Sequence, residues 1–355
     1  MRVPAYLLKT IASTLLAVTA TALHAATWSV DNKSPGAADF ESLSAAITAA
    51  SAGDTLVIAG SPTSYGEVTF DKELHLVGPG WHHDTNFPAA SPMNGAMITS
   101  ITLPNATANG SSFRSLQIGR LDADDCANLL IERIAPTFET GTAYIIFNNV
   151  NDATIRQCYR ISVQGNTLTS TSRNLKVYNN TLLLVQTAAS ESEFYHNVFL
   201  SYLINTSNAT FRYNIYYGAS LTLTLNNCLA EYNIIDATDG SNRDPWPGDT
   251  NLNDIPQEDI FTGGALGASY QLKQDSPAIN IDGLGTNAGI YGGDHPYILS
   301  GMPAVPVVYH VDAPVTAQAG ETINISFKAT AEPVIEDDGP TDGPTDDFPT
   351  DDLPQ

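Results

Sequence analysis

The chain has 355 residues, and its 15 Lys+Arg against 38 Asp+Glu give a net charge of −23. A surface this negative excludes a nucleic-acid-binding protein on electrostatic grounds. Hydrophobic residues make up 43% of the chain, enough to bury a core, whereas charged residues make up only 15%. Asn, Thr and Ser must therefore cover much of the surface, and these residues favour turns and β structure over a helical bundle.

The N-terminus has the pattern of a secretory signal peptide. Basic Arg2 and Lys9 precede an apolar run from Ile11 to Leu23, and Ala25-Ala26 follows. The run is shorter than the ~20 residues that a transmembrane helix needs, and no later stretch is long and apolar enough to span a bilayer. We expect residues 1–25 to be a signal peptide, cleaved near Ala25, and the mature protein to be secreted or located at the cell surface.

A short helix is predicted next, because residues 40–50 carry apolar side chains at helical spacing and Gly53 follows them. Such a helix would cover the open end of a stack of strands. Residues 55–59 are predicted to form the first strand, and residues 67–72 and 74–78 to continue the sheet.

Six similar segments follow, beginning at residues 128, 152, 174, 191, 208 and 227. In each, a polar first residue is followed by apolar or small residues at positions two and four, the spacing of a strand with one buried face. A repeat of about 20 residues fits one coil of two or three short strands with their turns. Because such a coil cannot bury its inner face alone, successive coils must stack into a parallel β-solenoid.

Position seven is asparagine in the last four copies, at Asn180, Asn197, Asn214 and Asn233. Stacked coils would place these amides at one corner, about 4.8 Å apart, where they can form a hydrogen-bonded ladder. Asparagine also tolerates the left-handed backbone of a sharp corner, so we expect that conformation at these positions.

The three cysteines are Cys126, Cys158 and Cys228, an odd number in a protein with an export signal. Each has apolar or small neighbours, which favours buried free thiols. One disulfide with a leftover thiol is the alternative. The Cys and His spacing does not suggest a zinc site.

One loop resembles a calcium loop in part, because Asp249, Asn251 and Asn253 place oxygen ligands at alternate positions. The loop departs from that pattern at Asp254, where glycine is expected, and at Ile260, where glutamate is expected. A polar turn is the favoured interpretation, so no cofactor is predicted and calcium remains only a weak alternative. The insertion from Asp236 to Asp259 is expected to overhang the solenoid.

The C-terminal part contains two β-rich runs, Val305–Val311 and Thr322–Ala329, which could cap the last coil or form a small terminal β unit. The final segment, Glu332–Gln355, has nine acidic residues and no Lys or Arg, so we expect a disordered spacer. The predicted division is a signal peptide over residues 1–25, a β-helix over 26–296, a C-terminal β segment over 297–331 and the acidic tail over 332–355.

Several motifs are similar to those of a known family. The opening motifs are Asp39-Phe-Glu-Ser-Leu, Gly53-Asp54-Thr-Leu and Leu76-Val-Gly-Pro-Gly80, and the closing ones are Asp275-Ser-Pro-Ala-Ile279 and Gly289-Ile-Tyr-Gly-Gly293. Together they resemble pectin-lyase-like proteins exported by bacteria, over roughly residues 27–330. The resemblance implies a right-handed parallel β-helix. It implies no particular activity, because the family includes polysaccharide lyases, hydrolases and members without a known reaction.

A binding site is predicted on the outer face of the repeats, because positions three and five point outward when two and four point inward. Aromatic rings and guanidinium groups at positions five and six suit the recognition of sugars and acidic sugars. The candidate polysaccharide-binding residues are Arg156, Tyr178, Tyr195, His196, Arg212 and Tyr213. The alternative is that these residues only stabilise the sheet through cross-strand pairs.

Catalytic residues are not identified by the sequence. Arg156 or Arg212 could serve as the base of a lyase, but no acidic cluster accompanies them, and Glu193 and Glu231 are poorly placed as a glycosidase pair. The leading hypothesis is therefore a protein that binds extracellular or cell-wall polysaccharide. A lyase or glycoside hydrolase acting on acidic polysaccharide, and a structural spacer at the cell surface, are the alternatives. The sequence makes no prediction of an oligomeric state.

Overall fold

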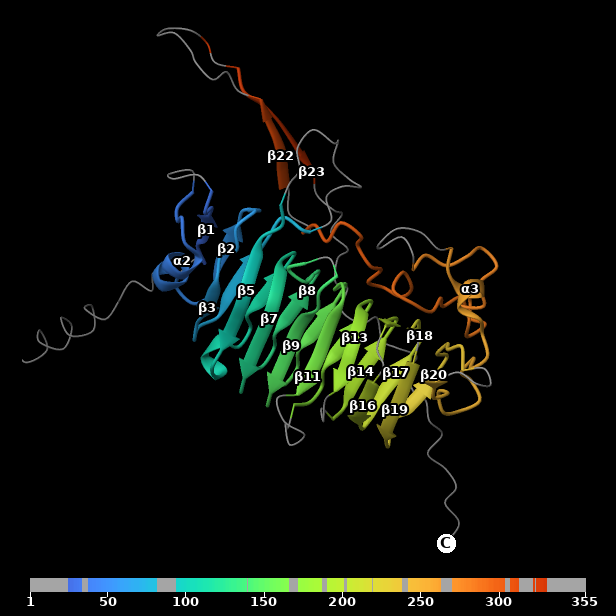
Figure 1. Cartoon of the computed structure of the whole chain (residues 1–355). Helices are drawn as coiled ribbons and strands as arrows, with labels where there is room; N and C mark the ends of the chain where they lie inside the picture. The colour runs from blue at the N-terminus through green and yellow to red at the C-terminus, as the bar shows by residue number, and fades with distance from the viewer. Residues whose placement is uncertain are drawn as a thin grey trace, which may run out of the picture.

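The structure is a computed structural model that describes residues 25–33, 38–81, 94–138, 140–165, 172–186, 190–200, 203–218, 220–237, 242–262, 270–303, 307–312, 322 and 324–330. Over these residues the chain forms a right-handed parallel β-helix with two long parallel sheets (Figure 1). The first sheet has ten strands and the second sheet has eleven. The predicted fold class is confirmed.

The strands of the first sheet are β1 (Thr27–Val30), β2 (Asp54–Ile58), β4 (Leu74–Val77), β6 (Ser112–Arg114), β8 (Leu130–Glu132), β10 (Thr154–Arg156), β12 (Lys176–Tyr178), β14 (Ser192–Tyr195), β17 (Ala209–Arg212) and β20 (Leu229–Glu231). Those of the second sheet are β3 (Glu67–Thr69), β5 (Met97–Leu103), β7 (Gln117–Asp124), β9 (Ala143–Asn148), β11 (Ile161–Gly165), β13 (Thr181–Gln186), β15 (Val198–Phe199), β16 (Leu203–Ser207), β18 (Ile215–Tyr216), β19 (Ser220–Asn226) and β21 (Asn242–Arg243). The remaining elements are helix α2 (Leu43–Ala49), a 3-10 turn (Ala106–Ala108), helix α3 (Gln257–Ile260) and strands β22 (Val307–Asp312) and β23 (Ser326–Thr330).

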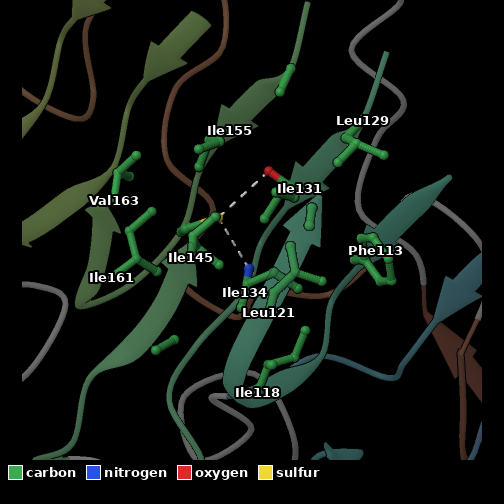
Figure 2. Packing of buried hydrophobic residues seen from close by; sticks show 14 of the residues in the cluster. Phe113, Ile118, Leu121, Leu129, Ile131, Ile134, Ile145, Ile155, Ile161 and Val163 are labelled. Carbon is green, nitrogen blue, oxygen red and sulfur yellow. Dashed lines mark hydrogen bonds between the residues drawn. The ribbon is translucent and has the colours of Figure 1, made fainter. Parts of the chain in front are cut away.

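The interior is a single apolar core shared by successive coils. Residues at positions two and four of the six repeats are buried, except for the half-buried Cys228. Figure 2 shows Ile131 and Ile155 of the first sheet gathered with Ile145, Ile161 and Val163 of the second sheet. The alternating pattern of the repeats therefore correctly predicts which side chains fill the interior of the solenoid.

The predicted asparagine ladder is present and fully buried. In each step, the Nδ2 of one asparagine donates to the Oδ1 of the next, at 3.1 Å from Asn180 to Asn197, 3.0 Å from Asn197 to Asn214 and 2.9 Å from Asn214 to Asn233. The ladder continues to a fifth member, since Asn233 Nδ2 donates to Asn251 Oδ1 at 2.9 Å. Asn251 was predicted as a turn residue of the calcium-like loop, and it instead closes the ladder at the C-terminal end.

The left-handed corner does not lie at the ladder, so that prediction is wrong. Position six has the positive φ instead, for example 57° at Asn179, 54° at His196 and 58° at Tyr213. Position one is also left-handed, for example 53° at Asn174. The ladder side chains point inward to bond the neighbouring coil, so the bend falls on the residue before them.

Helix α2 covers the N-terminal end of the solenoid, as predicted. Ser42 caps the helix by accepting the N–H of Ala45, and Leu43, Ala46 and Ile47 are buried. Lys72 Nζ donates to the carbonyls of Ile47 and Ala50 at 3.0 and 2.8 Å, which satisfies the C-terminal end of the helix. One detail of the prediction is wrong: β1 precedes the helix and pairs with β2, so residues 55–59 do not form the first strand.

Asp54 ties β1 to β2 through its buried carboxylate. It accepts hydrogen bonds from the N–H of Ala26 at 2.7 Å, from Trp28 Nε1 at 2.9 Å and from the N–H of Ser51 at 2.9 Å. Burial opposes ionisation, but the hydrogen bonds outweigh it and hold the pKa of Asp54 below its usual value. The charged form is therefore favoured by folding.

Replacement of this carboxylate, Asp54→Asn, is expected to lower the free energy of unfolding by about 1 kcal/mol at pH 7. Because the folded-state pKa lies below that of the unfolded chain, the contribution is present above about pH 4 and is lost as the pH falls through the folded-state pKa. Urea denaturation at pH 7 and pH 3 should show the wild-type advantage shrinking with acid, and the exposed Asp71→Asn should show none. An equal advantage at both pH values would contradict this assignment.

The three cysteines are free thiols, which excludes the disulfide alternative. Burial raises the pKa of Cys126 to about 11 and that of Cys158 to about 12. Cys158 stands at the head of the asparagine ladder, because its N–H donates to Asn180 Oδ1 at 2.9 Å. The dashed lines of Figure 2 mark the contacts of its sulfur with the Ile131 carbonyl and the Ile134 N–H. The Cys158 thiol thus occupies the position that a further asparagine side chain would have in the ladder.

The two C-terminal β-rich runs form a small antiparallel unit, β22 with β23, which is one of the two predicted outcomes. Figure 1 places it beside the N-terminal end of the solenoid, away from β20. The predicted signal peptide (except Ala25) and the acidic tail lie outside the described residues. No helix among the described residues is long and apolar enough to cross a membrane.

Candidate binding surface

The outward side chains of the first sheet form two rows, together called the outer face. The charged row runs through successive coils in register, and its members are Arg114, Glu132, Arg156, Tyr178, Tyr195, Arg212 and Glu231. The neighbouring row contains Ser112, Leu130, Thr154, Lys176, Glu193, Thr210 and Leu229. Four of the six predicted site residues therefore lie together, in consecutive coils of one row.

Ion pairs between neighbouring coils order both ends of the charged row. Glu132 lies between Arg156, at 3.0 Å, and Arg114, at 3.5 Å. Arg212 Nη2 lies 2.8 Å from Glu231. These are the cross-strand pairs that the alternative interpretation expects. The two arginines predicted as site residues differ in exposure: the Arg156 side chain is 14% exposed and the Arg212 side chain 39%, so Arg212 offers more of its surface to a ligand.

Tyr178 and Tyr195 occupy the middle of the row, between the two ion-paired groups. Both side chains are half-buried. Burial raises the pKa of Tyr195 to about 12, so its phenol stays protonated at neutral pH and can donate a hydrogen bond. Two adjacent aromatic side chains with charged neighbours are a surface that suits sugar rings bearing hydroxyl and carboxylate groups.

A C-terminal segment, residues 276–303, runs back along the solenoid next to the outer face and is called the strap. Side chains at position six bond to its backbone carbonyls, namely Gln157 Nε2 to Pro296 at 2.6 Å, Asn179 Nδ2 to Gly292 at 2.7 Å and to Ile290 at 2.9 Å, and Arg133 Nη1 to Met302. The order of these contacts shows that the strap runs opposite to the order of the coils. Position six is therefore a docking seam. The strap also crosses the predicted domain boundary at 296–297.

His196 and Tyr213, the other two predicted site residues, lie in this seam. Their rings stack at 5.0 Å, and Tyr213 also stacks on Tyr232 at 5.5 Å. His196 Nδ1 lies 3.0 Å from the carbonyl of Asn287, and the phenol of Tyr213 donates to Asp282 at 3.3 Å. Burial lowers the pKa of His196 to about 4, so the ring is neutral at pH 7. These contacts bind the strap, which separates both residues from the four in the charged row.

His295 is a residue that the sequence prediction missed. It belongs to the strap, and its ring stacks on Tyr178 with centroids 5.9 Å apart and planes 19° apart. The repeats carry no signal for it, because it lies outside them. The adjacent Gly292-Gly293 pair marks only a close approach of the backbone.

The calcium-like loop uses its amide oxygens within the fold. Asn251 Oδ1 accepts from the N–H of Asn233 at 2.8 Å, and Asn253 Oδ1 accepts from the N–H of Trp246 at 2.8 Å. Over the part of the chain that the structure describes, no group of three or more His, Cys, Asp or Glu residues is arranged to hold a metal ion.

The acidic residues of the outer face do not form a glycosidase pair. Glu193 lies in the neighbouring row and Glu231 in the charged row two coils further on. Two coils span about 9.6 Å, just beyond the roughly 5–9.5 Å separation that glycosidases use. Glu231 is also held by Arg212.

Comparison of the chain with protein-family models, with curated proteins and with solved structures finds no match.

Proposed function

We propose that the protein binds an acidic extracellular or cell-wall polysaccharide along the outer face of its first sheet. The observation that carries this proposal is the Tyr178–Tyr195 pair in the charged row, with Arg156 on one side and Arg212 on the other. The ring of Tyr195 and the part of the Tyr178 ring that His295 leaves uncovered would pack against sugar rings, and the exposed part of Arg212 would bind carboxylates.

The charge distribution supports an acidic ligand. The chain carries a net charge of −23, but the outer face places four cationic side chains (Arg114, Arg156, Lys176 and Arg212) against three acidic ones (Glu132, Glu193 and Glu231). An anionic polymer would meet less repulsion here than over a surface of average charge.

The proposal includes export, and with it an extracellular or cell-surface location. It rests on the basic start, the short apolar run and the Ala25-Ala26 exit of the N-terminus. The opening and closing motifs support a relationship with pectin-lyase-like proteins, although they support no reaction.

The test replaces both aromatic rings at once. Tyr178→Ala/Tyr195→Ala is expected to weaken binding to a bound acidic glycan about tenfold, because two aromatic contacts are lost. Isothermal titration against polygalacturonate, alginate, hyaluronan and a neutral glucan measures the effect, and absorbance of unsaturated products detects lyase turnover.

The matched control is Tyr144→Ala, because Tyr144 is a tyrosine of the second sheet that is 43% exposed. It should bind like the wild type. Unchanged binding by the double variant, or the absence of binding to every acidic glycan by the wild type, would overturn the proposal. Release of unsaturated products would favour the lyase alternative instead.

A further inference from the structure

The strap holds His295 over the outer face between two anchors. On one side Asn179, which is buried, donates to the carbonyls of Ile290 and Gly292. On the other side Gln157, also buried, donates to the carbonyl of Pro296 at 2.6 Å. His295 lies within the few residues between these anchors, so its position is set by side chains of two successive coils.

Two glycines let the strap approach this closely. A Cβ atom at Gly293 would lie 2.7 Å from the His196 ring, and one at Gly292 would lie 2.8 Å from His196 Nδ1. Gly293 also has a φ of 70°, which disfavours other residues. The segment Gly292–Pro296 therefore lies directly on the seam, and this places the half-buried His295 against Tyr178.

The groups around His295 come from four elements. Tyr178 and Lys176 lie on β12, Arg156 is the in-register neighbour of Tyr178 on β10, and Tyr195 is its neighbour on β14. Asp294 precedes His295 in the strap, and His196 lies beneath Gly293. Imidazole is the side chain whose ordinary protonation range lies between about pH 5 and pH 8. The low pKa of His196 keeps that ring neutral over most of it.

We infer that His295 is a ligand-contacting residue of the outer face, and that it makes the binding of acidic polysaccharide stronger as the pH falls. This inference rests on the proposed function. A protonated imidazole on Tyr178 adds a positive charge beside the tyrosine pair, where it attracts a sugar carboxylate. That charge is not expected to change the affinity for a neutral glycan.

The experiment measures the affinity for an acidic glycan, such as polygalacturonate, at pH 5.5 and pH 7.5. The wild type is expected to bind about threefold more tightly at pH 5.5, the gain typical of one added charge at a partly exposed site. His295→Gln is expected to bind with the same affinity at both pH values, because glutamine does not titrate. His75→Gln is the matched control, since His75 lies on β4 of the same sheet, four strands away from Tyr178 and beyond the members of the two rows. It should keep the wild-type pH dependence.

The outcomes separate the two proposals. If His295→Gln keeps the full pH dependence while both proteins bind, the role of His295 is overturned and the binding face stands. If the wild type binds no acidic glycan at either pH, the proposed function and this inference both fall. A pH dependence that is equal for the acidic glycan and the neutral glucan would show a general effect of pH and overturn the assignment to His295.

Discussion

Replacement of Asn214 by alanine is expected to lower the free energy of unfolding by about 4 kcal/mol. The Oδ1 atom of Asn214 accepts the N–H and the Nδ2 of Asn197, at 2.9 and 3.0 Å. Its Nδ2 donates to the carbonyl of Phe194 at 2.7 Å and to Oδ1 of Asn233 at 2.9 Å. The alanine variant leaves these partners in a fully buried site, and each unsatisfied buried group costs about 1–3 kcal/mol.

Urea denaturation followed by circular dichroism measures this loss. The matched control is Asn226→Ala, which removes an exposed asparagine at the end of β19. Its free energy of unfolding should stay within about 0.5 kcal/mol of that of the wild type. If Asn214→Ala unfolds at the same urea concentration as Asn226→Ala, the ladder does not hold the coils together.

Replacement of Asn179 by alanine is expected to lower the free energy of unfolding by about 3 kcal/mol and to release the strap from the seam. The side chain makes two buried hydrogen bonds to strap carbonyls, at 2.7 Å to Gly292 and 2.9 Å to Ile290. Its φ of 57° adds a smaller cost, because alanine tolerates the left-handed region less well than asparagine.

A second asparagine of the same coil, Asn174, separates the cost of the lost hydrogen bonds from the cost of the left-handed backbone. Asn174 has a φ of 53° and bonds Asp152 at an exposed site, so Asn174→Ala carries the backbone cost but leaves the strap docked. We expect Asn174→Ala to lower the free energy of unfolding by about 1 kcal/mol. Hydrogen exchange of residues 290–296 should accelerate in Asn179→Ala and not in Asn174→Ala. Equal exchange in both variants would contradict the role of position six as a docking seam.

The ladder shows how much of the fold can be predicted from the repeats. Four amides at one position of a regular strand pattern are enough to place Asn180, Asn197, Asn214 and Asn233 in one column, because inner positions of stacked coils superpose. Asn251 was not predicted because Pro245 and Pro247 interrupt the strand pattern before it, although Trp246 and Gly248 occupy positions two and four and Trp246 is buried. The left-handed corner could not be predicted from the repeats because position six holds Arg, Gln, Asn, His and Tyr, which share no conformational preference.

The candidate site could be predicted only in part, for a related reason. Alternation along a strand identifies the outward residues Arg156, Tyr178, Tyr195 and Arg212. It cannot show that His196 is covered, because the contacts that cover it come from the backbone of a segment 91 residues away, as its bond to Asn287 illustrates. Backbone carbonyls carry no signature in the sequence, so neither the strap nor His295 is visible in the repeats.

The location of a bound sugar decides whether the outer face of the first sheet is the binding site. A crystal structure of the protein with an oligosaccharide of the tightest-binding acidic glycan should show sugar rings against Tyr178 and Tyr195, with a carboxylate near Arg212. Density for the oligosaccharide on the second sheet or at an end of the solenoid, with the outer face of the first sheet empty, would show that the sugar binds elsewhere.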